Sequence, residues 1–230
     1  MLVLPSSLGT TTKLWDANVG YWSDTLSLLR YNLGARRSVD ELGEDLVQLL
    51  DDRGLERVSL CGVSLGGATV MWVAATVPER IDRLVLACTS ARFGDPEPWL
   101  ERAALVRQEG LESIADGIVA RWFTDRAPPE VVARFRRQLV ETPHETYAAG
   151  CEAVARWDFG DCLSSIQAPT LVIAAAEDRA TPTDHGELIV RAIPNARLVV
   201  LPDAAHLANV EQGEVFSTLV TEHLAAVEVA

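Results

Sequence analysis

Hydrophobic residues along the chain fall into two alternating kinds of segment. Short aliphatic runs, typical of strands buried on both faces of a parallel sheet, occupy residues 2–7, 55–63, 81–90, 169–178 and 196–204. Segments with apolar residues at helical spacing occupy residues 38–54, 66–80, 183–193 and 215–227, the first of them after a Ser38 cap. Strands that alternate with helices predict an α/β protein with a mostly parallel sheet covered on both faces.

One region interrupts this alternation. Residues 94–159 contain helical patterns and turn signals, such as GDPEP and RAPPE, but no convincing strand. We therefore expect a core formed by residues 1–93 and 160–230 and a helical cap, or lid, formed by residues 94–159. Residues 91–140 hold eight arginines and eight acidic residues, so the cap is the part least repulsive to an anionic ligand.

Composition narrows the class of protein further. The 230 residues are 48% hydrophobic, enough for a core without disulfides or metals, and carry a formal net charge of −13. This charge argues against a nucleic-acid partner, which requires a clustered cationic face. Cys61 and Cys88 lie in apolar runs typical of buried thiols. We find no apolar run long enough to span a bilayer and no signal-peptide pattern, so we expect a cytoplasmic protein without a membrane partner.

The candidate chemistry begins with the sequence GVSLGG. Gly62, Ser64 and Gly66 have G-x-S-x-G spacing, and the segment joins a predicted strand directly to a predicted helix. A serine nucleophile requires this strand–turn–helix setting, in which glycines permit close packing and the helix amino terminus favours negative charge. The alternative is an ordinary serine in a structural turn. The context favours Ser64 as a nucleophile.

A serine hydroxyl also needs a base and an orienting acid. His206 follows the last predicted strand and is the best-placed base, whereas we expect the three other histidines, at positions 144, 185 and 223, at the surface. Asp178 follows the penultimate strand and completes the chain order Ser, Asp, His of α/β-hydrolases. Three further carboxylates compete for the acid role: Glu177, Asp158 and Asp161.

Two backbone N–H groups are candidates for stabilising a developing oxyanion. Leu65 directly follows the nucleophile, and Leu8 lies in the loop after the first strand, with Ser7 as the neighbouring alternative. No Cys/His cluster has metal-ligand spacing and no glycine-rich loop suits a nucleotide, so we expect neither a metal nor another cofactor.

Segments along nearly the whole chain form a recognisable set: SSLGTTTKLWD, GVSLGG, ERIDRLVLACTSARFG, ARWFTD, ETPHETYAAGCEAVARWDF and LPDAAHLANVE, together with the W-x-x-R of Trp99 and Arg102. Together they resemble the 3-oxoadipate enol-lactonases of the β-ketoadipate pathway. G-x-S-x-G identifies only the α/β-hydrolase superfamily. The cap segments ARWFTD and YAAGCEA point to this particular family.

The resemblance implies an α/β-hydrolase fold and the hydrolysis of 3-oxoadipate enol-lactone to 3-oxoadipate, in bacterial aromatic catabolism and without a cofactor. Ser64, Asp178 and His206 take the positions of nucleophile, acid and base. The implied substrate is a small anionic lactone, for which Trp122 and Arg102 are the candidate binding residues. The chain departs from the family where RYNLGARRS replaces a longer R-Y-D-x-R-G-H-G-x-S stretch; Arg36 and Arg37 stand there instead.

Two other functions fit the same sequence. The first is a general carboxylesterase or a hydrolase of another small lactone, since fold and triad do not determine substrate. The second is a non-catalytic ligand-binding protein, whose signature would be a lost triad member, and none is lost here. The residues also leave open whether Ser64 attacks covalently or His206 activates water, and they indicate no oligomeric state.

Overall fold

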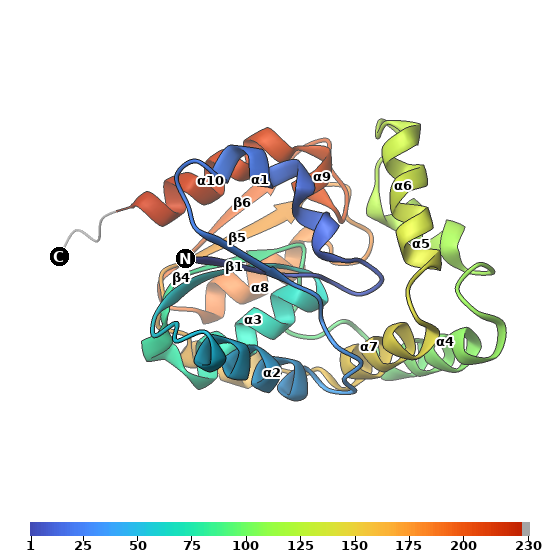
Figure 1. The fold of residues 1–230 in the computed structure, drawn as a ribbon, viewed down its shortest axis with the longest axis horizontal. Helices are drawn as coiled ribbons and strands as arrows, with labels where there is room; N and C mark the ends of the chain where they lie inside the picture. The colour runs from blue at the N-terminus through green and yellow to red at the C-terminus, as the bar shows by residue number, and fades with distance from the viewer. Residues whose placement is uncertain (227–230) are drawn as a thin grey trace.

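The centre of the molecule is a six-stranded parallel sheet in the order β2-β1-β3-β4-β5-β6. This computed structural model describes residues 1–226. The strands are β1 (Leu2–Pro5), β2 (Leu28–Tyr31), β3 (Val58–Val63), β4 (Ile81–Ala87), β5 (Thr170–Ala175) and β6 (Ala196–Leu201). The carboxyl ends of all six strands therefore lie at one edge of the sheet (Figure 1).

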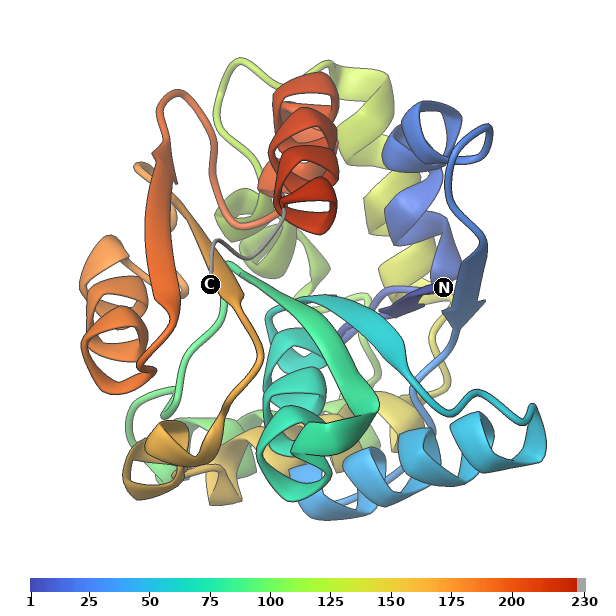
Figure 2. The ribbon, with the colours of Figure 1, turned by 90° about the vertical axis from the view of Figure 1, so that its left-hand side faces the viewer.

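Helices cover both faces of this sheet, as Figures 1 and 2 show. On one face lie α1 (Asp16–Trp22), α9 (Ala208–Glu211) and α10 (Gly213–Ala225). On the other lie α2 (Val39–Asp52), α3 (Leu65–Thr76) and α8 (Thr183–Ala192). Short 3-10 helices are η1 (Thr12–Trp15), η2 (Pro78–Arg80) and η3 (Gly160–Ser165). The doubly covered parallel sheet that the sequence predicts is confirmed.

Two hydrophobic cores follow from the alternation of side chains along the strands. Leu2 and Leu4 of β1 pack toward α1 and α10, where Trp15, Trp22 and Phe216 are fully buried. Val3, between them, packs on the opposite face with the leucines of α2 and the aliphatic residues of α3. Because β1, β3 and β5 are buried on both faces, and β4 is buried from residue 84 onward, these strands read in the sequence as mostly apolar runs.

Local signals predicted some elements and not others. The helix after Ser38 has a complete capping box with Glu41, as its sequence suggests. The sequence did not predict β2, because this edge strand has four residues and its burial is only partial. Helix α1 was not predicted either, since seven residues give too few turns for a clear period. The helix expected at 215–227 is α10, and residue 227 lies outside the described residues.

Four helices form the insertion between β4 and β5. They are α4 (Pro96–Glu109), α5 (Ala115–Trp122), α6 (Pro129–Val140) and α7 (His144–Arg156). α4 packs on α7, and α5 packs on α6, beyond the carboxyl edge of the sheet (Figure 1). The helical insertion is therefore confirmed, while its treatment as a separate domain of residues 94–159 stays a prediction.

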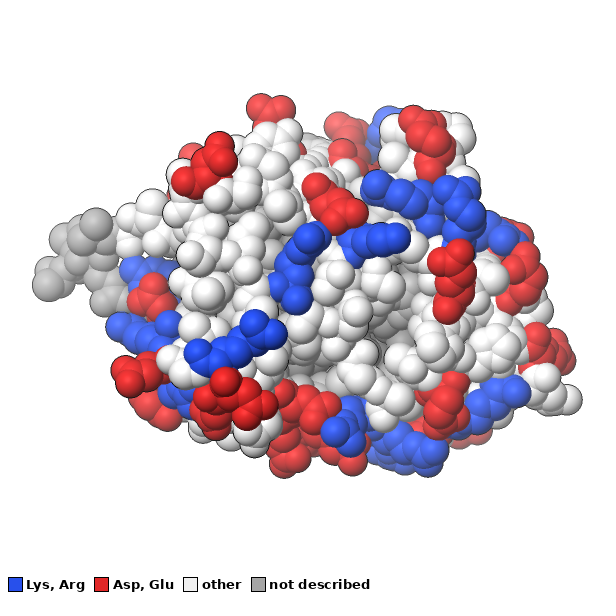
Figure 3. Space-filling model, in the orientation of Figure 1, with Lys and Arg blue, Asp and Glu red and all other residues white. Residues whose placement is uncertain are grey.

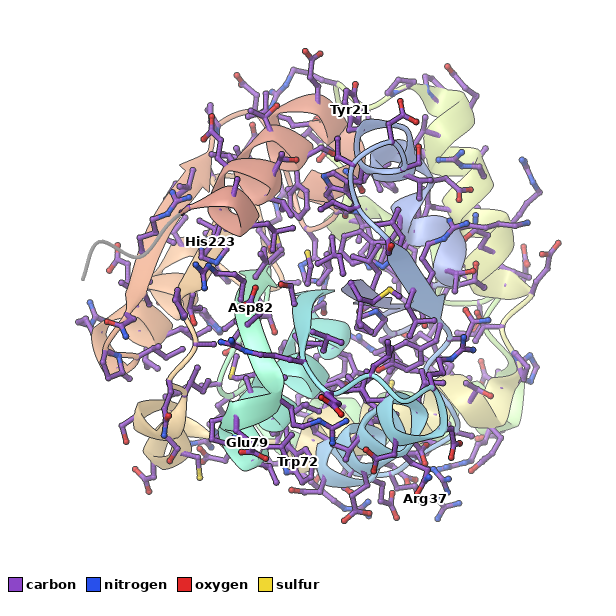
Figure 4. All side chains as sticks on the ribbon, turned by 60° about the vertical axis from the view of Figure 1, so that its left-hand side comes forward. Tyr21, Arg37, Trp72, Glu79, Asp82 and His223 are labelled. Atoms are coloured by element: carbon purple, nitrogen blue, oxygen red, sulfur yellow. The ribbon has the colours of Figure 1, made fainter. Side chains whose placement is uncertain are left out.

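Ion pairs fasten this insertion to the core. Arg37, in the loop before α2, binds Glu145 at 2.9 Å and Glu152 at 3.4 Å, both on α7. Arg107 of α4 binds the same two carboxylates at 2.8 and 2.6 Å. Figure 4 shows Arg37 at the edge of the molecule beside α2. Glu152 is almost buried, so this cluster is less screened by solvent than an ordinary surface pair.

Two expectations about exposure have different outcomes. Cys61 and Cys88 are buried, as predicted. His223 was expected at the surface, but it is 5% exposed and its Nε2 lies 3.2 Å from Leu84 O and 3.1 Å from Pro169 O. Figure 4 shows it at the strands that α10 covers. Burial lowers the pKa of His223, so the ring is a neutral packing element.

Among residues 1–226, no helix is long and apolar enough to cross a membrane.

Candidate active site

The candidate residues meet at the carboxyl edge of the sheet because each directly follows a strand or lies in the loop after one. Ser64 follows β3, Asp178 lies in the loop after β5, and His206 lies in the loop after β6. The loop that contains Leu8 follows β1. In open α/β sheets this edge is where ligands bind. Residues more than a hundred positions apart are thereby brought to one site.

Ser64 stands on a strained turn. Its backbone has φ 54° and ψ −120°, in a region that residues with a side chain rarely adopt. A Cβ on Gly62 would lie 2.4 Å from Gly66 O, and one on Gly66 would lie 2.6 Å from Ser6 O. Thr89 donates its hydroxyl to Ser64 O at 2.7 Å and fastens the turn to the end of β4. The two glycines of G-x-S-x-G are thus required by backbone contacts on both sides of the serine.

Asp178 and His206 are hydrogen-bonded partners. His206 Nδ1 lies 2.8 Å from Asp178 Oδ2, and both side chains are buried. Asp178 Oδ1 accepts from the backbone N–H groups of Ala180 and Thr181, at 2.7 and 3.0 Å. Thr181 Oγ1 donates to Asp178 Oδ2 at 2.7 Å. The carboxylate is therefore held from several sides and cannot rotate away from the imidazole.

These contacts also determine the charge of the pair. Burial by itself would raise the pKa of Asp178, but the charge of His206 and hydrogen bonds from His206 and Thr181 outweigh it. The net pKa of Asp178 lies below its ordinary value. An ionised carboxylate on Nδ1 places the Nδ1 proton between the two residues and directs the basic Nε2 lone pair outward.

The competing acids are engaged elsewhere. Glu177 forms an ion pair with Arg126, and Asp158 lies 3.8 Å from Arg92. Asp161 is exposed in η3. Of the other histidines, His144 is exposed at the start of α7, and His185 Nδ1 lies 2.7 Å from Ser90 Oγ. The geometry therefore favours Asp178 and His206 as the acid and the base.

Leu65 and Leu8 lie close to the candidate nucleophile. Leu65 is the first residue of α3, where a helix leaves backbone N–H groups without intrahelical partners. Leu8 lines the same cavity as Ser64, next to Ser7. A Cβ on Gly150 of α7 would lie 2.6 Å from Leu8 Cδ1 and 3.5 Å from Leu65 Cδ2. The glycine of the YAAGCEA segment therefore gives both leucines room beneath the cap.

A cavity of about 680 Å³ lies between the sheet edge and the cap. Ser64 and His206 line its core side, and α4 and α5 contribute most of its cap side. This volume fits a small organic substrate with space to spare. Both predicted binding residues, Arg102 and Trp122, line the cavity as well.

Trp122 has an unused hydrogen-bond donor. Trp122 is the last residue of α5 and is 6% exposed. Its ring contacts Phe135 edge-on. The other five tryptophans donate their indole N–H to protein oxygens. Within residues 1–226, no protein acceptor is hydrogen-bonded to Trp122 Nε1. Because Trp122 lines the cavity, a ligand there can accept a hydrogen bond from this N–H group.

Three arginines line the cavity: Arg102, Arg121 and Arg179. In the described part of the chain none of them forms an ion pair with Asp or Glu, unlike Arg107 in the cluster on α7. Arg102 stacks over Trp99, with 4.6 Å from guanidinium carbon to ring centroid, and borders the buried phenol of Tyr147. Figure 3 shows Lys and Arg side chains gathered over α5 and α6. The cavity thus offers unpaired positive charge in an acidic protein, although Asp95 and Glu101 also border it.

Sequence reasoning missed two residues of this site. Nothing singled out Thr181 or Arg179, although Thr181 follows Asp178 in the ED-x-x-T segment. Arg36 and Arg37, which stand where the family has its longer stretch, are paired with Asp45 and with the α7 carboxylates. They are not among the residues that line the cavity. Among residues 1–226 no group of three or more His, Cys, Asp or Glu side chains could hold a metal ion.

A protein family and several known proteins match this chain. The family model described as the alpha/beta hydrolase fold matches residues 9–212. The chain belongs to the α/β-hydrolase family. Within it, 3-oxoadipate enol-lactonase 2 of Acinetobacter baylyi is 36% identical over 228 residues, which cover 94% of this chain and 85% of that protein.

Solved α/β-hydrolase structures agree with this placement. The enol-lactonase from Burkholderia xenovorans LB400 has a TM-score of 0.94 at 34% identity, with 98% of this chain and 91% of that one covered. A hydrolase from Pseudomonas aeruginosa PA01 has a TM-score of 0.92 at 40% identity, with 98% and 90% covered. The chain is therefore a 3-oxoadipate enol-lactonase-like α/β-hydrolase, as the resemblance in its sequence implied.

Proposed function

We propose that this hydrolase opens 3-oxoadipate enol-lactone to 3-oxoadipate, with Ser64 as nucleophile, His206 as base and Asp178 as the orienting acid. The observation that carries the proposal is the combination of the Asp178–His206 contact with a cavity lined by two donors, Trp122 and Arg102, that suit a carboxylate. The names of the similar proteins support the choice of lactone.

In the proposed reaction His206 Nε2 removes the Ser64 Oγ proton as Oγ bonds to the lactone carbonyl carbon. The backbone N–H groups of Leu65 and Leu8 stabilise the resulting oxyanion. When the carbonyl re-forms, the ring C–O bond breaks, and the enolate leaves and becomes the ketone on taking a proton. Water, deprotonated by His206, then releases the acid from Ser64.

Ionised Asp178 supports each of these steps. The imidazolium formed on His206 lies 2.8 Å from the Asp178 carboxylate, which stabilises the positive charge. The strained Ser64 backbone at the start of α3 fixes Oγ at the cavity wall. Because an enolate is a good leaving group, His206 could instead activate water to attack the lactone directly. That route would need the same three residues.

Recognition of the substrate rests on its charge. The lactone carries one carboxylate, and a charge-assisted hydrogen bond is shorter and stronger than a neutral one. Arg102, immobilised by stacking on Trp99, and the Trp122 N–H are donors on the cap side of the cavity. We place the carboxylate there, with the lactone carbonyl directed toward Ser64.

The test is a direct comparison of substrates. Purified protein is assayed with freshly generated 3-oxoadipate enol-lactone and with a neutral ester, p-nitrophenyl acetate. The proposal predicts a kcat/KM for the lactone at least a hundredfold above that for the ester. Turnover of the ester with none of the lactone would instead show a general esterase, and binding of the lactone without turnover of either would show a non-catalytic protein.

A further inference from the structure

Glu211 of α9 bridges two segments that are far apart in sequence. Its Oε1 accepts from Thr124 N at 2.9 Å and from Thr124 Oγ1 at 2.8 Å. Its Oε2 accepts from Ala205 N at 2.7 Å. One carboxylate is thus shared between the segment after α5 and the loop after β6. Figure 1 shows α9 on the side of the core that faces α5 and α6.

Each of these segments carries a residue of the cavity. Ala205 directly precedes His206, and Thr124 lies two residues after Trp122. Leu207 N donates to Trp122 O at 2.9 Å, so the two segments also touch through their backbones. His206 and Trp122 both line the cavity. The position of the candidate base therefore depends mechanically on the position of a candidate binding residue on the cap.

We propose that Glu211 is a positioning residue that fixes the His206 loop against the cap, so that His206 and Trp122 keep a constant position relative to each other. This inference rests on the proposed function, since it assigns Glu211 a role through His206. Glu211 does not line the cavity and touches no reacting atom.

The chemistry of the bridge requires a carboxylate of this length. All three partners are donors, and an ionised carboxylate is an acceptor at both oxygens. A glutamine would direct its NH₂ group at one set of donors and lose that end of the bridge. An aspartate is one methylene shorter and would span the two segments poorly.

The experiment measures how fast Ser64 reacts with phenylmethylsulfonyl fluoride, which needs a positioned base but carries no carboxylate for the cap donors to bind. Serine Oγ displaces fluoride from sulfur, and its proton passes to the base. Glu211→Gln is compared with wild type and with Glu214→Gln, a matched change on the next helix. In the described residues Glu214 has no hydrogen bond or ion pair. Rates are taken on folded protein, well below the midpoint of thermal unfolding.

The proposal predicts that Glu211→Gln slows sulfonylation of Ser64 at least tenfold and lowers kcat for ester or lactone by a similar factor. Glu214→Gln should stay within twofold of wild type, and Thr124→Val, which removes one donor of three, should fall between them. A Glu211→Gln protein with a lower melting temperature but wild-type sulfonylation would overturn the positioning role. If wild type itself is not labelled at Ser64, the proposed function fails first, and this inference fails with it.

Discussion

His206 Nδ1 lies 2.8 Å from Asp178 Oδ2, and Thr181 Oγ1 donates to that same oxygen at 2.7 Å. Thr181 Oγ1 is also 3.5 Å from His206 Nδ1, so the three side chains form a compact buried group. Because the carboxylate is held by Thr181 and by two backbone N–H groups, it determines which ring nitrogen carries the proton. The orientation of the base is therefore built into the loop after β5.

This arrangement predicts different effects for two substitutions in the group. Asp178→Asn removes the charge that stabilises the imidazolium and should lower kcat by roughly 10²- to 10⁴-fold. Thr181→Val removes one hydrogen bond to the carboxylate while keeping the shape, and should lower kcat by about tenfold or less. Steady-state kinetics of the two variants on one substrate give the comparison. Equal losses would contradict this ranking and would mean that the Thr181 hydrogen bond matters to the base as much as the Asp178 charge does.

The unused indole donor predicts a substrate-dependent effect. Trp122→Phe keeps the aromatic contact with Phe135 but removes the N–H. If Trp122 binds the carboxylate, KM for the anionic lactone should rise about tenfold or more, because a hydrogen bond to a charged group contributes about 1.5–3 kcal/mol. KM for p-nitrophenyl acetate should change less than twofold. A matching rise for the ester would show that Trp122 only shapes the cavity.

The lowered pKa of Asp178 predicts how stability depends on pH. A folded-state pKa below the ordinary 3.8 means that the unfolded chain binds more protons in acid, so stability rises with pH there. The contribution is complete above 3.8 and is lost as the pH falls through the lower folded-state pKa. Urea unfolding from pH 6 down to about 3 should therefore show the deficit of Asp178→Asn shrinking toward acid. A constant deficit would contradict the lowered pKa.

The close approach of Gly66 to Ser6 predicts a loss of both stability and rate. A Cβ there would lie 2.6 Å from a backbone oxygen, which cannot move as a flexible side chain can. Gly66→Ala should cost about 1–3 kcal/mol, typical of overpacking, and should lower kcat by shifting the loop that carries Leu8. Gly20→Ala is the control, since a Cβ at Gly20 in α1 has nothing within 4 Å. Denaturant unfolding that ranks Gly66→Ala with the control would refute the contact.

Much of the fold was readable from the sequence for a physical reason. Strands buried on both faces are mostly apolar, so β1, β3, β5 and the second half of β4 stand out as short aliphatic runs between periodic helices. β2 escaped notice because its four residues, LLRY, are too few to form a clear aliphatic run; β6, the other edge strand, has six residues and was predicted. The surface position expected for His223 was wrong because helical spacing does not show that backbone oxygens of β4 and of the segment before β5 would receive its ring.

The residues of the site likewise fall into those that the sequence predicts and those that it does not. Ser64, Asp178 and His206 follow strands, and strand ends of a parallel sheet meet at one edge, so their proximity could be inferred. Arg121, Arg179 and Glu211 could not be inferred as a group, because their positions depend on how the cap packs against the core. Pairing between charges is likewise invisible in the sequence: Arg36 is paired with Asp45, whereas Arg102 has no ion pair in the described residues.

The most direct test of the account is the hydrolysis of 3-oxoadipate enol-lactone by wild type and by Ser64→Ala, measured side by side with circular dichroism as the check on folding. The account predicts rapid loss of the lactone with wild type and a fall in kcat of at least about 10³-fold in the variant, with an unchanged spectrum. Lactone turnover that survives in folded Ser64→Ala would contradict the assignment of Ser64 as the nucleophile.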